Sequence, residues 1–396
     1  MDYRWINAIR ADLTGKPEVS LKLELEDLAA AGAAETLANP VLGTAWLALI
    51  QNALIDHPEH WMVWREGGLG LGKEMRRNFS AVLGRFMARA YLERRQGIRD
   101  FVAISNPNLL HLGLAIKRHN NLIDLPDWVA ADGAAGLVLA EAKGAHTPSD
   151  NAPRNWEIGY ANPLGRAERQ LTNSYVEAPN GDEVPVKRWA VTSRWASENG
   201  PQTPFLVAWD PADDREVPPD DKHAMLARLR RVATSSLLGG MGFTDLADDV
   251  LRGEITDNLD RGAVGLRDSP ASSDEPVFAA ALGAFGVVNL ADVDLDTLRR
   301  LQGRSGVETM VFGLTRSSIK AAIVGESREA PQPDLQAEDN EQFNRLVVDS
   351  LRRDGGDLIE QRSAKPVTER IFKRDPARRI YRLDAIAAIE SGDLSS

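Results

Sequence analysis

The chain has 396 residues and a formal net charge of −11; 43% of its residues are hydrophobic and 27% are charged. This composition is typical of a soluble globular protein, and the length suits two or more domains of about 150 residues each. Apolar runs of the roughly 18 residues needed to cross a bilayer, a signal-peptide pattern and cysteines are all absent from the sequence. We therefore expect a cytoplasmic protein without disulfides, cysteine zinc sites or a membrane partner.

Residues 1–71 are predicted to form a helical segment. Leu21–Ala34 is rich in Ala, Leu and Glu, and Pro40 precedes the mostly apolar stretch Val41–Ile55. A proline in the first turn of an apolar stretch is typical of a helix. The glycine-rich stretch Gly67–Gly72 lacks the Gly-Lys-Ser/Thr ending of a phosphate-binding loop, so it indicates a flexible connector.

A helix and a short strand are predicted next. From Glu74 to Tyr91, apolar side chains recur at spacings of three and four residues, which is the period of a helix with one buried face. Gly97 ends this helix after two arginines, as is common at helix C-termini. Phe101–Ile104 is a short apolar run and favours a strand.

A β-hairpin is predicted over Leu125–Lys143. Two apolar runs, Leu125–Ala131 and Leu137–Lys143, are joined by a short Asp-Gly segment with a second Gly at its end. This is turn chemistry, because Gly takes positive φ at little steric cost. The alternative is an ordinary surface hairpin with a solvated Glu and Lys. The uninterrupted apolar run before Glu141 argues against it, since such a run is typical of a buried central strand.

The predicted hairpin brings two carboxylates and an ammonium group together. Side chains alternate across a strand, so Glu141 and Lys143 project to one face. Asp127, near the start of the partner strand, could approach that face at the end of the sheet. The two carboxylates and the backbone carbonyl of Ala142 are hard oxygen ligands suited to Mg²⁺, for which Mn²⁺ can substitute. A bound cation lowers the pKa of a water, and Lys143 could orient that water or offset negative charge on a phosphate.

Pro126-Asp127, followed by Glu141-Ala142-Lys143 on the next strand, resembles the PD-(D/E)XK nuclease superfamily, which includes restriction endonucleases, junction resolvases and recombination exonucleases. The resemblance covers residues 72–210 and implies an α/β fold with a restriction-endonuclease-like αβββαβ core. It also implies a Mg²⁺-dependent phosphodiesterase, in which Asp127, Glu141 and the Ala142 carbonyl hold the metal and Lys143 assists the attacking water.

The resemblance also suggests a residue on the first helix. In this superfamily that helix often carries a further glutamate that faces the metal. Glu74 fits best, and Glu93 near the other end of the helix is the alternative. An equally simple interpretation of Glu74 is that its negative charge stabilises the N-terminus of the helix.

Pro163–Val176 is predicted to be the helix that follows the hairpin. Several branches of the superfamily place a glutamine on this helix, sometimes with a tyrosine four residues later. Gln170 fits this pattern, whereas Tyr175 lies one residue too far along. Arg166 and Arg169 could bind a phosphate through two nitrogens, or they form the exposed side of the helix.

Two strands are predicted to complete the sheet, at Lys187–Trp195 and Thr203–Trp209, where apolar and polar residues alternate. All nine tryptophans lie at or before Trp209, and this shift in composition indicates a domain boundary soon after it.

The rest of the chain is predicted to add a second module and a basic tail. After an acidic, proline-rich linker, residues 222–325 are expected to form a small α/β or α+β module. Residues 326–340 are predicted to be a linker, because they are charged and contain two prolines. Residues 341–396 are predicted to be a helical, basic C-terminal segment, whose arginines could track a nucleic-acid backbone or form a solvated face.

Two functions are open on the sequence. The leading hypothesis is a metal-dependent nuclease acting on nucleic acid, DNA more than RNA, in restriction, phage defence or repair. Residues 60–235 hold 23 Lys and Arg against 21 Asp and Glu, so the region around the motif permits phosphate binding despite the net charge. Cutting both strands would favour a homodimer. The alternative is a catalytically silent protein with a nuclease-like fold that binds nucleic acid or a partner protein.

Overall fold

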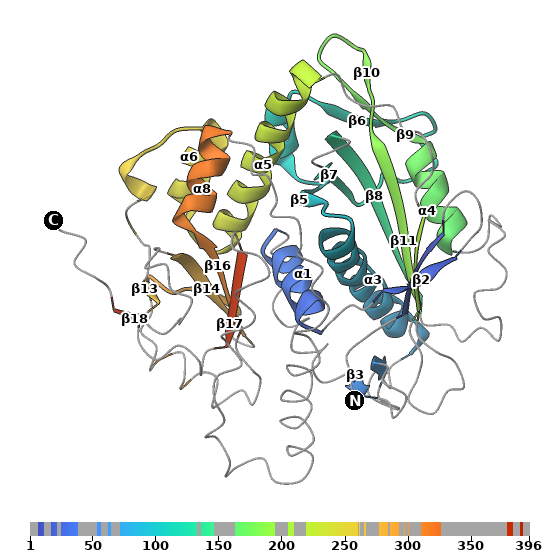
Figure 1. Cartoon of the computed structure of the whole chain (residues 1–396), viewed down its shortest axis with the longest axis horizontal. Helices are drawn as coiled ribbons and strands as arrows, with labels where there is room; N and C mark the ends of the chain where they lie inside the picture. Colours follow the sequence, from blue (N-terminus) through green and yellow to red (C-terminus); the bar gives the residue numbers. More distant parts are fainter. Residues whose placement is uncertain are drawn as a thin grey trace, which may run out of the picture.

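The computed structural model shows a mixed α/β protein in which helices pack on a central sheet (Figure 1). The Gly-rich connector before Gly72, the linker 326–340 and residues 341–377 lie outside the residues that the structure describes, as does the stretch 41–53. The described residues are 7–11, 17–21, 25–38, 54–56, 62–64, 72–132, 136–145, 163–194, 205–209, 219–259, 261, 265–266, 277–283, 286–292, 297, 300, 310–325, 378–382 and 389–390.

Seven strands form the central sheet, in the order β2-β1-β12-β11-β8-β7-β5. The five from β12 to β5 make up its main part, and β1 and β2 extend it at one edge. β5, β7 and β8 pair antiparallel, whereas β8 pairs with β11 in parallel and β1 pairs with β12 in parallel. The strands are β1 (Asn7–Ala11), β2 (Pro17–Leu21), β5 (Arg99–Ala103), β7 (Trp128–Asp132), β8 (Gly136–Ala145), β11 (Lys187–Arg194) and β12 (Phe205–Trp209).

Helices cover both faces of this sheet, because the side chains of β8 alternate between two hydrophobic cores. Ala140 and Ala142 belong to the core formed with α1 and α3, and Leu137 and Leu139 to the core formed with α4 and part of α5. By the same alternation, Glu141 is on the α4 face. The helices are α1 (Leu25–Ala38), α3 (Lys73–Arg95), α4 (Pro163–Thr172) and α5 (Pro219–Gly240).

Helix α3 crosses β8 at a pair of glycines. A Cβ atom on Gly84 would lie 2.5 Å from the backbone nitrogen of Gly144, and one on Gly144 would lie 1.6 Å from the carbonyl oxygen of Ser80. Neither position therefore accepts a side chain without movement of backbone. This close crossing places α3 directly against β8 at the residue after Lys143.

Two small antiparallel sheets accompany the central one. The sheet β10-β9-β6 lies beside α4, and the sheet β15-β14-β16-β17 packs with α5, α6 and α8. Two short strand pairs, β3-β4 and β13-β18, and two 3₁₀ helices complete the described elements. Their bounds are β3 (Leu54–Asp56), β4 (Met62–Trp64), η2 (Pro107–Leu112), β6 (Ala115–Arg118), β9 (Ser174–Glu177), β10 (Glu183–Val184), α6 (Thr244–Arg252), η3 (Asp257–Leu259), β13 (Gly265–Leu266), β14 (Val277–Gly283), β15 (Gly286–Asn289), β16 (Met310–Thr315), α8 (Arg316–Val324), β17 (Arg378–Arg382) and β18 (Ile389–Glu390).

Helix α1 connects the central sheet to the second module. It packs against α3 on one side and α5 on the other (Figure 1). A Cβ atom on Gly240 of α5 would lie 2.1 Å from the carbonyl oxygen of Leu37, so these two helices touch through their backbones. Phe278 and Phe312 of the second module share one hydrophobic core with α1 and α3. Buried side chains are thus continuous across the predicted boundary after residue 210.

The structure confirms the elements around the predicted motif. β7 and β8 form the expected hairpin, α3 follows Gly72, and β5, β11 and β12 coincide closely with the predicted strands. The module after residue 222 contains both helices and strands, as predicted.

Three predictions of helix were wrong in part. In the segment 1–71, Asn7–Ala11 and Pro17–Leu21 are strands, because β1 finds a parallel partner in β12, far along the chain. The helix predicted over Pro163–Val176 ends at Thr172, since the next four residues pair with β6 and β10 as β9. In the segment 341–396, the described residues are the strands β17 and β18, and β17 pairs with β16.

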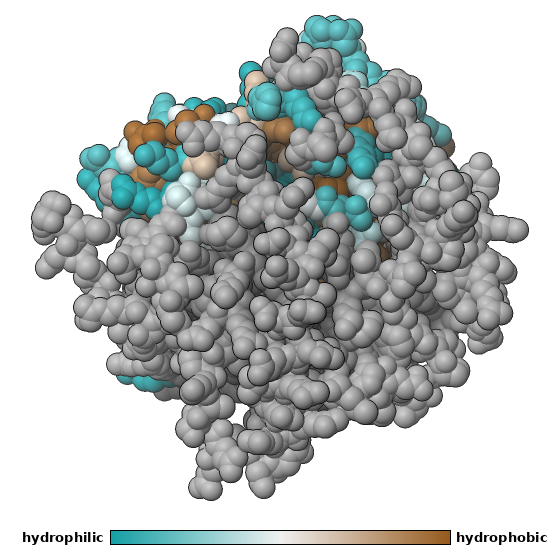
Figure 2. All heavy atoms as spheres, viewed as in Figure 1, coloured by the Kyte–Doolittle hydropathy of each residue, from teal (hydrophilic) through white to brown (hydrophobic). Residues whose placement is uncertain are grey.

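The described part of the surface alternates between hydrophobic and hydrophilic side chains. Figure 2 shows hydrophobic patches interrupted by hydrophilic residues on the visible face. Among the described residues, no helix combines the length and the hydropathy that crossing a membrane requires.

The glycine crossing predicts a strong effect of a single methyl group. We expect Gly84→Ala to lower the free energy of unfolding by about 1–3 kcal/mol, because the methyl group would overlap the backbone of β8. Urea denaturation would measure this loss. The matched control is Gly239→Ala in α5, where the nearest atom to an added Cβ lies at 3.9 Å. There the higher helix propensity of alanine should leave stability unchanged or raise it by up to about 1 kcal/mol. An equal loss in both variants would contradict the crossing.

Candidate active site

Asp127 is held by its backbone at the point where β7 begins. Its N–H donates to the carbonyl of Ala140 at 3.1 Å, and its own carbonyl accepts a hydrogen bond from the N–H of Ile104 at 3.1 Å. The first residue of β7, Trp128, pairs with Ala140. Asp127 therefore lies beside the part of β8 that continues past the end of β7.

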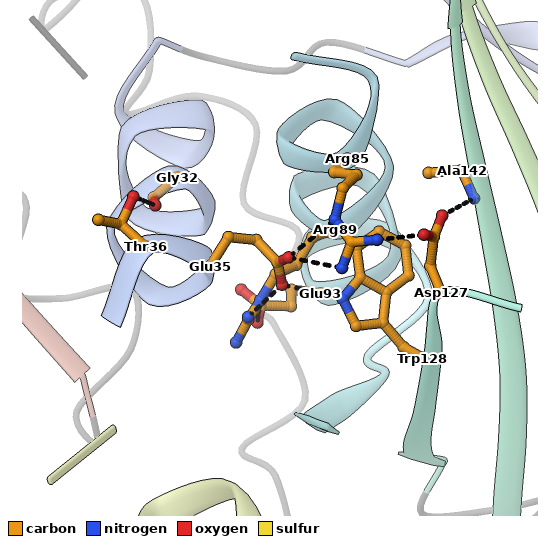
Figure 3. Close-up of polar contacts among 9 residues, drawn as sticks. All are labelled: Gly32, Glu35, Thr36, Arg85, Arg89, Glu93, Asp127, Trp128 and Ala142. Atoms are coloured by element: carbon orange, nitrogen blue, oxygen red, sulfur yellow. Dashed lines mark hydrogen bonds and ion pairs between the residues drawn. The ribbon is translucent and has the colours of Figure 1, made fainter. Parts of the chain in front are cut away.

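The carboxylate of Asp127 contacts both β8 and α3 (Figure 3). Its Oδ2 accepts a hydrogen bond from the N–H of Ala142 at 2.8 Å, and its Oδ1 forms an ion pair with Nη1 of Arg85. In a strand, the N–H and the carbonyl of one residue point to the same side. The carbonyl of Ala142 therefore faces the same side of β8 as Asp127.

Glu141 is the buried member of the hairpin motif, with only 1% of its surface exposed. Its Oε1 forms an ion pair with Nζ of Lys143, and its Oε2 has no hydrogen-bond partner among the described residues. Burial raises the pKa of Glu141 to about 8; repulsion by Asp127 adds to this, and attraction to Lys143 and Arg85 opposes it. Because Asp127 accepts a hydrogen bond from Ala142, the residue after Glu141, the two acids lie near one another and are called the acidic pair.

The acidic pair offers a divalent cation a small but suitable set of donors. Oε2 of Glu141 is buried and has no hydrogen-bond partner within the described ranges, and Asp127 and the Ala142 carbonyl provide further oxygen atoms. Mg²⁺ commonly binds proteins through one or two carboxylates and completes its shell with water and substrate phosphate. In the described part of the chain, no group of three or more acidic or histidine side chains has the arrangement of a metal site. Asp127, Glu141 and the Ala142 carbonyl are thus the residues that could hold a cation of the Mg²⁺ type, which would also need oxygens from water and substrate.

Helix α4 packs on β8 and carries the other residues suggested by the resemblance. Nε2 of Gln170 donates to the carbonyl of Leu125 at 3.1 Å, which fixes the backbone that leads into Asp127. Arg166 is exposed, and Arg169 donates from Nε to the carbonyl one helical turn earlier, at 3.3 Å. Gln170 therefore contacts the backbone before the hairpin, while Arg166 is exposed and Arg169 is half-buried.

The structure does not bring Glu74 to the acidic pair. Glu74 is exposed in the first turn of α3, eleven residues before Arg85. At the rise of an α-helix this separates them by roughly 16 Å along the axis. Glu93, the alternative, is bound to Arg89 at 2.9 Å instead. Glu74 is left with the simpler interpretation, stabilisation of the helix N-terminus.

A buried ion network, formed by Glu35, Arg85, Arg89 and Glu93, was not predicted (Figure 3). The carboxylate of Glu35 in α1 accepts hydrogen bonds from Nε and Nη2 of Arg85, at 3.2 and 3.0 Å. It accepts another from Nη1 of Arg89, at 2.7 Å. Glu35 also accepts a hydrogen bond from Nε1 of Trp128 at 3.0 Å. Arg85 is the member that also reaches Asp127, so the network joins α1 to the acidic pair through α3.

Only part of this network has a signal in the sequence. Arg85 and Arg89 are four residues apart and so share one side of a helix, close to its apolar stripe. Glu35 is a lone acid in an alanine-rich segment, and the predicted helix stopped one residue before it. The contact between Glu35 and Arg85 joins residues 50 apart, which no local pattern reveals.

No protein-family model, curated protein or solved structure matches this chain. What the site can do chemically therefore follows from its own residues.

The raised pKa of Glu141 predicts a pH dependence of stability. Its pKa is about 8 in the folded protein against 4.5 in the unfolded chain, so the folded state binds the proton more tightly. The resulting stabilisation is complete below pH about 4.5 and is lost as pH rises to about 8, with a slope of up to about 1.4 kcal/mol per pH unit.

Urea denaturation in EDTA between pH 5 and 8.5 would measure this dependence. We expect Glu141→Gln to flatten the decline, because the amide has no proton to lose. Asp248→Asn, at an exposed position of α6, is the control and should follow the wild type. Parallel profiles of wild type and Glu141→Gln would contradict the prediction.

Proposed function

We propose that this protein is a divalent-metal-dependent nuclease that hydrolyses phosphodiester bonds in nucleic acid, with DNA as the expected substrate. The observation that carries the proposal is the buried Oε2 of Glu141, beside Asp127 and Lys143, which has no hydrogen-bond partner in the part of the chain that the structure describes. A buried carboxylate is costly unless a proton or a cation compensates its charge. A cation that meets Oε2 of Glu141 and the carboxylate of Asp127 would supply that compensation.

The order of elements around the acidic pair supports this proposal. α3, β5, β7, β8, α4 and β11 follow one another as in the αβββαβ core of the PD-(D/E)XK superfamily, with β6, β9 and β10 inserted. The β5-β7-β8 unit is antiparallel and β8 pairs with β11 in parallel; Asp127 immediately precedes β7, and Glu141 is in the neighbouring strand β8. The restriction-endonuclease-like fold is thus part of the proposal.

Each side chain of the site would have its own role in the reaction. Asp127, Glu141 and the carbonyl of Ala142 would hold the metal, Mg²⁺ or Mn²⁺. The metal would supply an acidified water and stabilise charge on the phosphoryl group. Lys143, which is paired with Glu141, would orient a water or offset negative charge on the phosphate. Gln170 keeps Asp127 in position by holding the backbone of Leu125.

Arg166 and Arg169 are proposed to bind the nucleic-acid backbone away from the reacting phosphate. They are three residues apart on α4, so they share one side of the helix that packs on β8. Contacts of this kind contribute salt-dependent affinity without reading sequence.

A second candidate function has its own supporting observation. Both carboxylate oxygens of Asp127 already have protein partners, Arg85 and the N–H of Ala142. A side chain satisfied in this way has less need of a metal. This favours a catalytically silent protein that uses a nuclease-like fold to bind nucleic acid or a partner.

The proposed function predicts metal-dependent cleavage that depends on the motif. In Mg²⁺ or Mn²⁺, the wild type should cleave plasmid, linear DNA or RNA, and Asp127→Asn or Lys143→Met should reduce the rate at least about 100-fold. Mg²⁺ should also raise the melting temperature of the wild type at pH 8, and Glu141→Gln should abolish this shift. Gel assays and thermal melts measure the two effects.

The exposed control variant Asp248→Asn should match the wild type in both assays. Cleavage that all the substitutions leave unchanged would point to a contaminating nuclease. Nucleic-acid binding without cleavage, unaffected by EDTA and by Asp127→Asn, would establish the silent binding protein instead.

A further inference from the structure

Arg85 connects a fully buried acid, Glu35, with a partly exposed one, Asp127. Its Nε and Nη2 hold Oε2 of Glu35 at 3.2 and 3.0 Å, and its Nη1 pairs with Oδ1 of Asp127. Its guanidinium carbon also lies 4.3 Å from the ring centre of Trp128, a cation–π contact (Figure 3). One end of the guanidinium group is thus bound to the buried ion network and the other end to the acidic pair.

The end bound to Glu35 is fixed. Glu35 is 1% exposed and accepts hydrogen bonds from Arg85, Arg89 and Trp128. Removing Arg85 from Glu35 would leave a buried charge with fewer partners, which is strongly unfavourable. The position of the guanidinium group is therefore set by α1 and the sheet rather than by Asp127.

The end bound to Asp127 is exchangeable. The side chains of Arg85 and Asp127 are 21% and 20% exposed, so water and ions reach this pair. A divalent cation bound to Asp127 would need the same carboxylate that Nη1 of Arg85 holds, and it would repel the guanidinium charge. The cation and Arg85 thus compete for Asp127.

We propose that Arg85 neutralises Asp127 in the metal-free protein and, once a cation binds, donates the same Nη1–H group to a phosphate oxygen of the nucleic acid. This inference rests on the proposed nuclease function and adds a substrate-binding residue to it. Glu35 and Trp128 keep the guanidinium group beside Asp127 throughout, so the donor is already in place when the phosphate arrives.

The chemistry of arginine suits this exchange. Its guanidinium group stays charged at any physiological pH and carries five N–H donors in a planar fork that matches phosphate geometry. Two of these donors hold Glu35 and one holds Asp127; as far as the described residues show, two remain for a further acceptor. A charge-assisted bond to phosphate would replace the one given up to the cation.

A purely structural role for Arg85 gives a different result. If Arg85 only tied α3 to Glu35, its removal would lower stability and leave the affinity for metal unchanged or weaker. If it competes with the cation, its removal must tighten metal binding while it slows cleavage. The two measurements then change in opposite directions, which simple damage to the fold does not produce.

The experiment measures Mn²⁺ binding by calorimetry without nucleic acid, and single-turnover cleavage of a short DNA duplex at saturating Mn²⁺. For Arg85→Met we expect an Mn²⁺ dissociation constant about tenfold lower, because a repelling charge is gone, and cleavage at least about tenfold slower. Arg85→Lys keeps the charge and should bind Mn²⁺ like the wild type. Arg77→Met, at an exposed position of the same helix, is the control and should change neither measurement.

Unchanged or weaker Mn²⁺ binding by Arg85→Met would overturn the competition, and unchanged cleavage would overturn the phosphate contact. Should Arg85→Met fail to fold in a thermal melt, Arg85→Gln, which retains a donor for Glu35, is measured in the same way. If the wild type neither binds Mn²⁺ nor cleaves the duplex, the proposed function itself is wrong. If the wild type does both, the results for Arg85→Met test the role of Arg85 alone.

Discussion

The candidate site depends on how the protein compensates two neighbouring carboxylates. Asp127 meets Arg85 and a backbone N–H, and remains partly in contact with water. Glu141 is buried, is paired with Lys143 through one oxygen, and has its pKa raised to about 8. Without a metal, burial favours a proton on Glu141, Lys143 opposes this, and Arg85 offsets the charge of Asp127. In the proposed nuclease, a divalent cation would replace the proton and Arg85, so that proton release from Glu141 and displacement of Arg85 would be two parts of one event.

The fold supplies this arrangement from three directions. The β7–β8 hairpin sets Asp127 beside Ala142, and the crossing of Gly84 over Gly144 brings α3 close enough for Arg85 to reach the hairpin. Helix α1 then fixes Arg85 through Glu35, and α1 itself is held between α3 and α5. The second module supports the site indirectly, because its helix α5 packs against α1, the helix that positions Arg85.

The sequence predicted what depends on local pattern and missed what depends on distant pairing. The hairpin followed from its turn glycines and apolar runs, and the helix α3 from its apolar stripe. β1 was missed because its partner β12 lies almost 200 residues away, and a short strand has little signal without its partner. Glu74 was chosen by its place at the start of α3, but the residue of α3 that reaches Asp127 is Arg85. The point where a helix crosses a strand, here Gly84 and Gly144, decides which turn of the helix faces the strand. The spacing of apolar residues along the helix does not predict that point.

The ionisation of Glu141 also bears on the choice between a nuclease and a silent binding protein. A protein that only retained the fold could place an amide or an apolar side chain at position 141 and avoid the cost of burying an ionisable group. Instead it carries a carboxyl group whose pKa lies within reach of physiological pH and whose Oε2 has no hydrogen-bond partner among the described residues. Groups perturbed by both burial and a charged neighbour are concentrated at functional sites, because there a small change in surroundings changes the charge. In the proposed nuclease that change would be the binding of a cation to Oε2 of Glu141, and Asp127 lies close enough to Ala142 to share it.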